Sequence, residues 1–218
     1  STGEVLVDHK GDLSLPPASL TKIMTGYVLA DEVDSGRASL DDIISVSRTA
    51  WSQNPTFKGS SLMWIEPGKP VSLSDLERGV IISSRNDASV AVAEHLAGTE
   101  ASFVDVMNQL AGELGLDNTA YRNPHGLPHP EHRTTARDLA TLSVALINNH
   151  PEHYKIYKEQ SFTYNGIKQY NRNSLLRSDS SVDGLKTGYT SEAGYGLVAS
   201  AQREGMRLVS VVLGSASK

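Results

Sequence analysis

Residues 195–213 read YGLVASAQREGMRLVSVVL. Two runs rich in apolar residues, 195–203 and 206–213, flank the dipeptide Glu204-Gly205. A two-residue connection that contains glycine is typical of a β-hairpin, because glycine adopts the positive φ angles that such tight turns require. We therefore predict two neighbouring antiparallel strands at this end of the chain.

The segments that precede this hairpin set the fold class. A second hairpin is predicted at 162–170, around the turn dipeptide Asn165-Gly166. Val5-Leu6-Val7 is predicted to be a short strand. Between these strands the apolar spacing is helical, with caps predicted at Ser72 or Ser74, Gly115, and Thr134 or Thr135. The predicted helices cover residues 19–33, 72–82, an Ala/Val-rich segment that ends near 98, 100–114 and 135–147. Such segregation of helices and strands indicates an α+β fold, with helices packed on an antiparallel sheet.

Composition excludes several classes of protein. The 218 residues carry a net charge of −5, whereas a nucleic-acid-binding domain is basic. The sequence contains no cysteine, which rules out disulfides, thiol nucleophiles and thiolate metal sites. No apolar run reaches the roughly 18 residues of a membrane-spanning helix.

Three short patterns carry groups suited to acyl-transfer chemistry. Ser-x-x-Lys occurs at Ser19/Lys22 and again at Ser215/Lys218. Ser-x-Asn occurs at Ser84/Asn86 and at Ser52/Asn54, whereas Lys-Thr-Gly occurs once, at residues 186–188. The first two patterns are weak alone, since each has a chance match in the same chain, and their structural setting must separate the two copies.

Ser19 and Lys22 have the favourable setting, because they lie one turn apart on a predicted amphipathic helix. Leu20, Ile23 and Met24 would bury that turn. Burial disfavours the charged form of an amine and lowers the pKa of Lys22, and a neutral amine can accept the serine proton. Lys218, at the end of the chain, would keep its hydration.

The two copies of Ser-x-Asn also differ in setting, and each motif taken alone has a purely structural interpretation. Ser84 lies in a polar break between two helices, where it can face a cleft, whereas Ser52 lies in an irregular loop. Taken singly, Ser19 could be a helix cap, Ser84 to Asp87 could cap the next helix, and residues 186–188 could end a strand in a turn. Together and in this order the three patterns favour a catalytic function.

The chain resembles the D-alanyl-D-alanine carboxypeptidases, the low-molecular-mass penicillin-binding proteins, whose motifs are of this kind. The likeness extends over essentially the whole chain. Segments similar to that family are residues 17–25 (PASLTKIMT), 57–63 (FKGSSLM), 125–127 (HGL), 135–138 (TARD), 171–173 (NRN) and 182–188 (VDGLKTG).

The resemblance implies a β-lactamase/D,D-peptidase-like α+β fold, in which a five-stranded antiparallel sheet with packed helices meets an all-helical subdomain at the active site. It implies the following roles. Ser19 is the acylated nucleophile, Lys22 its base and Ser84 the relay of the proton to the leaving amine. The substrate is bound by Asn86, Arg172, Lys186, Thr187, Gly188 and Tyr189. Asn86 also orients Lys22, and the backbone of Tyr189 completes an oxyanion hole with that of Ser19. Position 189 is tyrosine where some relatives carry histidine. No cofactor or metal is implied.

The implied function is removal of the terminal D-alanine from peptidoglycan stem pentapeptides, with β-lactams as covalent inhibitors. The implied location is the periplasm or the outer face of the cell membrane. Family domains begin before Ser1 and continue past Lys218 into a β-rich domain and a membrane anchor. We therefore expect residues 1–218 to be one catalytic domain, trimmed at both ends.

Four alternatives differ in chemistry. A β-lactamase of the same fold uses a deacylating Glu-x-x-Leu-Asn motif, which is absent here. A D,D-endopeptidase is poorly distinguished by sequence. A non-catalytic β-lactam sensor would need a membrane span for coupling. A metallopeptidase is disfavoured because there is no His-Glu-x-x-His helix; we expect His129 and His132 to be exposed and His125 to pack its loop.

Overall fold

The computed structural model describes residues 3–217, and its main sheet is antiparallel with the strand order β5-β6-β7. These strands are Val182–Thr190, Gly194–Arg203 and Met206–Ser215. Both predicted hairpins are confirmed: β6 pairs with β7, and β3 (Ser161–Tyr164) pairs with β4 (Ile167–Tyr170). At each turn both central residues have positive φ, as the turn dipeptides predicted. A third pair, β1 (Ile43–Ser45) with β2 (Pro70–Ser72), has no counterpart among the predicted strands.

The strand count differs from the expectation. Within residues 3–217 the main sheet has three strands, where the resemblance implied five. The predicted strand Val5–Val7 is also wrong, because this segment forms no ladder with any described strand and its three side chains are exposed. A strand needs both a partner and a buried face, and this short apolar run has neither.

The helices agree closely with the predicted ones. Ser72 and Thr135 cap α2 and α5 by accepting hydrogen bonds from the backbone N–H of Asp75 and Asp138. Gly115 follows α4 with a φ of 70°, as a helix-ending glycine should. The α-helices are α1 (Lys22–Asp34), α2 (Leu73–Ile81), α3 (Asn86–Ala97), α4 (Glu100–Glu113), α5 (Ala136–Asn149), α6 (Pro151–Tyr154) and α7 (Leu175–Ser178), and the 3-10 turns are η1 (Ala18–Thr21), η2 (Pro55–Phe57) and η3 (Lys155–Lys158).

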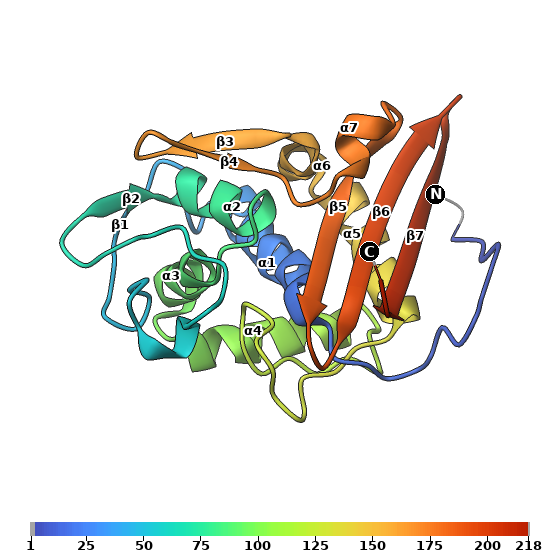
Figure 1. Ribbon diagram of the computed structural model, residues 1–218, viewed down its shortest axis with the longest axis horizontal. Helices are drawn as coiled ribbons and strands as arrows, with labels where there is room; N and C mark the ends of the chain where they lie inside the picture. Colours follow the sequence, from blue (N-terminus) through green and yellow to red (C-terminus); the bar gives the residue numbers. More distant parts are fainter. Residues whose placement is uncertain (1–2, 218) are drawn as a thin grey trace.

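Helix α1 occupies the centre of the molecule. It lies between the sheet and the helical group formed by α2, α3 and α4, while α5 packs behind the sheet on β7 (Figure 1). The prediction that this helix is amphipathic is therefore wrong for residues 22–30, the first nine residues of α1, because all of them are buried. A helix that is enclosed on every side is a core helix, and it carries Lys22 into the core with it.

Within residues 3–217, no helix combines the length and the apolar character that crossing a bilayer requires.

Candidate active site

Ser19 lies on η1, the 3-10 turn that leads into α1, so the α-helix begins at Lys22 rather than at Ser19 as predicted. The backbone at Ala18 has a φ of 48°, an uncommon value for a residue with a side chain. Gly126 presses against this turn, because a Cβ at residue 126 would lie 1.8 Å from the Ala18 carbonyl oxygen. The contact between Gly126 and Ala18 therefore fixes the position of the backbone that carries the Ser19 side chain.

Lys22 is 1% exposed and lies next to Ser19. Its Nζ is 3.3 Å from Ser19 Oγ, and it donates hydrogen bonds to Asn86 Oδ1 at 2.7 Å and to the His125 carbonyl oxygen at 2.6 Å. Burial lowers the pKa of Lys22 well below its usual value, and the nearby charges of Lys186 and Arg172 lower it further. A neutral amine beside a serine hydroxyl is the arrangement that activates the oxygen as a nucleophile.

The predicted break between two helices is confirmed, and it brings Asn86 to Lys22. Ser84 is buried, has a φ of 62°, and its hydroxyl makes no hydrogen bond within the described part of the chain. A strained residue with an unpaired buried hydroxyl is typical of a functional position. Asn86 begins α3, and its backbone N–H donates to the Ser61 carbonyl at 2.9 Å.

Asp87, which follows Asn86 in the first turn of α3, also belongs to the site, and the sequence motifs did not identify it as a site residue. Its buried carboxylate accepts hydrogen bonds from the backbone N–H groups of Met63, Trp64 and Ala88, at 2.8–3.0 Å. Burial raises the pKa of Asp87, against the lowering effect of these donors. The only feature of the sequence that could have pointed to Asp87 is its place as an acidic residue in the first turn of a helix. The loop that it binds, which contains Met63, lies more than twenty residues away in sequence.

The Lys-Thr-Gly pattern lies in the middle of β5, so the reading of a strand end followed by a turn is wrong. Lys186 is 2% exposed, and burial, reinforced by the charge of Arg172, lowers its pKa to about 7. Gly188 lets η1 approach the strand, because a Cβ there would meet Leu20 Cγ and the Pro17 carbonyl at 3.2 Å. Tyr189 is 56% exposed, and its ring packs on that of Tyr195 with centroids 4.4 Å apart.

Arg172 is exposed and donates from Nη2 to Ser61 Oγ at 3.1 Å. Its charge lowers the pKa of both Lys22 and Lys186, so Arg172 and the protonated form of Lys186 create a region of positive potential beside Lys22. Such a region suits an anionic group on a ligand.

Three expectations about histidines have different outcomes. His125 is buried and packs its loop, and His129 is exposed, both as predicted. The expectation that His132 is exposed is wrong. This ring is 2% exposed, and burial lowers its pKa to about 3. Thr21 donates its hydroxyl to the Ala18 carbonyl and therefore accepts from His132 Nε2 at 2.9 Å, which ties the histidine to η1.

The second copies of the motifs lie elsewhere. Ser52 is buried, and its backbone N–H donates to Ile65. Ser215 ends β7, where its hydroxyl donates to the Ser217 carbonyl, and Lys218 lies outside the described residues.

Comparison with known proteins identifies this arrangement. The family model described as D-alanyl-D-alanine carboxypeptidase matches residues 1–217. The D-alanyl-D-alanine carboxypeptidase DacC of Escherichia coli is 50% identical over 217 residues, which are 99% of this chain and 54% of that protein. A D-alanyl-D-alanine endopeptidase of Pseudomonas aeruginosa is 32% identical, over 91% of this chain and 63% of that protein.

The fold is that of the penicillin-binding proteins. The crystal structure of penicillin binding protein 6B from Escherichia coli superposes with a TM-score of 0.94 at 48% identity, over 98% of this chain and 68% of that one. Penicillin-Binding Protein D2 from Listeria monocytogenes, in a cefotaxime-bound form, superposes with a TM-score of 0.88 at 32% identity, over 98% and 85%. The chain belongs to the D-alanyl-D-alanine carboxypeptidase family, and it spans about half the length of the curated carboxypeptidases that it matches.

Proposed function

We propose that this chain is the catalytic core of a serine D-Ala-D-Ala carboxypeptidase. It removes the terminal D-alanine from peptidoglycan stem pentapeptides through an acyl-enzyme on Ser19, and β-lactams inhibit it by acylating the same residue. The observation that carries the proposal is the Lys22 amine, which is buried, has a lowered pKa and lies 3.3 Å from Ser19 Oγ.

The residues act in the following sequence. Neutral Lys22 takes the proton of Ser19, and Ser19 Oγ attacks the carbonyl carbon of the scissile amide. The backbone N–H groups of Ser19 and Tyr189 stabilise the resulting oxyanion. As the intermediate collapses, the amine of the departing D-alanine takes a proton relayed through Ser84. Water then attacks the ester, with Lys22 and Ser84 serving a second time.

Substrate binding follows from the charges and from the strand. Lys186 and Thr187 hold the terminal carboxylate of the peptide, and Arg172 adds to the positive potential there. Asn86 orients both the peptide and Lys22, to which it is hydrogen-bonded at 2.7 Å. Gly188 keeps this part of β5 free of a side chain, so an extended peptide can add beside the strand.

Residues 1–218 form a single catalytic domain in this proposal. The full-length protein continues into a β-rich domain and a membrane anchor, and it acts in the periplasm or on the outer face of the cell membrane. The support is the family and the fact that the curated carboxypeptidases are almost twice as long as this chain. A D,D-endopeptidase is the main alternative, and it has a named relative at lower identity than the carboxypeptidases.

Lys186→Ala should weaken turnover of peptides that end in a free carboxylate by roughly ten- to hundredfold, the value of a charge-assisted contact of about 1.5–3 kcal/mol. The same peptides amidated at the C-terminus should lose far less. Because the pKa of Lys186 is about 7, the KM of the wild-type chain for the carboxylate peptide should rise as the pH increases through 7, with no such rise for the amide. Steady-state kinetics of both peptides measure this.

The exposed Lys158 is the matched control, because Lys158→Ala removes the charge of a lysine that belongs to none of the three motifs. Equal losses on the carboxylate and the amide would show that Lys186 does not read the terminal charge.

Deacylation separates a carboxypeptidase from a β-lactamase. The departing D-alanine leaves space for water, whereas an opened penicillin ring stays tethered and obstructs its approach. We expect deacylation to be at least about tenfold faster with an acyl-D-Ala-D-Ala peptide than with benzylpenicillin, a barrier difference of about 1.4 kcal/mol. Stopped-flow acylation followed by a chase measures both rates. Rapid penicillin turnover without D-alanine release would overturn the proposal, and cleavage confined to cross-linked peptides would favour the endopeptidase.

A further inference from the structure

The Lys22 amine depends on two fixed acceptors. A neutral amine has two N–H bonds and one lone pair. The Asn86 side-chain oxygen and the His125 carbonyl oxygen lie 2.7 and 2.6 Å from Nζ, and both are buried. If these acceptors take the two N–H bonds, the lone pair is left for the hydroxyl of Ser19, 3.3 Å away. The position of the His125 carbonyl therefore sets the direction of the base.

A tight turn, residues 123–127, holds that carbonyl. Asn123 Oδ1 accepts from the backbone N–H of Gly126 at 2.6 Å, and Asn123 Nδ2 donates to the Leu127 carbonyl at 3.0 Å. The turn is also bound to α1, because Thr25 donates its hydroxyl to the Pro124 carbonyl at 2.6 Å. Nothing in these contacts fixes the His125 side chain.

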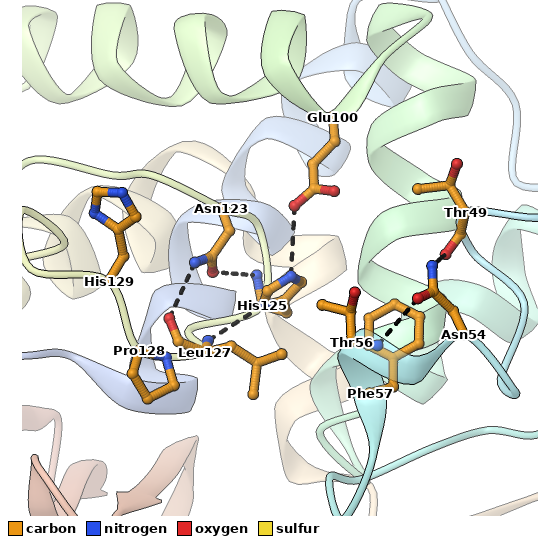
Figure 2. A pocket seen from close by; sticks show the side chains of 10 residues that line it. All are labelled: Thr49, Asn54, Thr56, Phe57, Glu100, Asn123, His125, Leu127, Pro128 and His129. Atoms are coloured by element: carbon orange, nitrogen blue, oxygen red, sulfur yellow. Dashed lines mark hydrogen bonds and ion pairs between the residues drawn. The ribbon is translucent and has the colours of Figure 1, made fainter.

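The His125 ring is held at both of its nitrogens. Nδ1 accepts from the backbone N–H of Leu127 at 3.1 Å, so in the neutral ring Nε2 carries the proton. Nε2 lies 3.4 Å from Glu100 Oε1, at the start of α4. Figure 2 shows these contacts in a cavity of about 250 Å³, where the Glu100 carboxylate points at the ring from the helix above. Burial lowers the pKa of His125, which favours the neutral ring.

We infer that Glu100 is a positioning residue for Lys22 and acts through His125. Glu100 accepts a hydrogen bond from His125 Nε2–H and so fixes the ring. His125 Nδ1 then accepts from the backbone N–H of Leu127, and the turn of residues 123–127 places the His125 carbonyl oxygen where it orients the Lys22 amine. The inference rests on the proposed function, in which Lys22 activates Ser19. Within residues 3–217, Glu100 makes no hydrogen bond or ion pair with Ser19 or Lys22.

The test is the acylation of the full chain by benzylpenicillin, with noncovalent binding and the first-order acylation step resolved separately. A reacting group displaced by about 1 Å costs about a hundredfold in rate, so partial loss of orientation in Glu100→Ala should slow acylation by about tenfold. Noncovalent binding should not change. Glu100→Gln keeps an acceptor for Nε2–H and should restore the rate, whereas the shorter Glu100→Asp should not.

Two controls isolate the route. Glu113→Ala removes an exposed glutamate at the other end of α4 and should leave acylation unchanged. His125→Asn keeps an acceptor for the Leu127 N–H but cannot reach Glu100. If Glu100 acts through the ring, Glu100→Ala should cause no further loss in the His125→Asn background.

Acylation at the wild-type rate in Glu100→Ala, or full additivity in the double variant, would overturn the inference. If Glu100→Ala does not fold, the comparison of Glu100→Gln with Glu100→Asp decides, and equal rates for these two would overturn it. Absence of a wild-type adduct on Ser19 would instead contradict the proposed function.

Discussion

Ser19→Ala should abolish covalent labelling by penicillin, whereas the wild-type chain should gain one penicilloyl group on Ser19. The reason is that Ser19 is the hydroxyl next to a buried amine whose pKa is lowered. Without that oxygen no ester can form at the site, and a second nucleophile cannot replace it. Intact-mass and peptide mass spectrometry after incubation with benzylpenicillin measure the adduct and its position.

Two other serines test whether the labelling is specific. Ser215 lies on β7 and is hydrogen-bonded to Ser217, so Ser215→Ala should be labelled like the wild type. Ser84→Ala should still be labelled on Ser19 but more slowly, because in the proposed mechanism Ser84 relays a proton and does not form the ester. An adduct on Ser84 or Ser215 in the Ser19→Ala chain would refute the choice of nucleophile.

Lys22→Met should slow acylation of Ser19 by about 10²–10⁴-fold, the usual contribution of a general base. Methionine fills a similar unbranched volume in the core but cannot accept the proton. The noncovalent affinity for benzylpenicillin should change far less than the acylation rate constant, because the anchoring charge of Lys186 is intact. Rapid-mixing kinetics with the isolated variant separate the two quantities.

Lys22→Arg shows whether the base or the charge matters. Arginine stays protonated at every working pH, so it carries a positive charge at the site and cannot act as a base. We expect the same large loss of acylation as with methionine. A rate within about tenfold of the wild type in the Lys22→Met chain would mean that another group deprotonates Ser19. Thermal unfolding of each variant verifies that it is folded.

The features that depend on near neighbours could be predicted from the sequence. The turns at Asn165-Gly166 and Glu204-Gly205 follow from the φ angles that these dipeptides tolerate, and the caps at Ser72 and Thr135 from one hydrogen bond within each first turn. The pairing of Ser19 with Lys22 belongs to the same group, because a spacing of three residues places both on one helical face.

The features that depend on distant segments could not be predicted from spacing and periodicity. The acceptors of the Lys22 amine, Asn86 and His125, are 64 and 103 residues away in sequence; the family resemblance implied the contact with Asn86, and nothing in the sequence pointed to the carbonyl of His125. The loop that Asp87 binds, the burial of His132 against Thr21 and the place of Lys186 inside a long strand all depend on long-range packing. The local pattern at Val5–Val7 was misleading, because no described strand pairs with it.

The sequence by itself therefore determined the α+β class, the caps of α2 and α5, the hairpins and the pairing of a serine with a lysine. Only the tertiary structure decided that this lysine is enclosed on every side, beside Lys186 and Arg172 and with two buried acceptors. The physical reason is the distance along the chain over which each effect acts. Turn and cap geometry is set within a few residues, whereas the desolvation that lowers the pKa of an amine is the sum over everything packed around it.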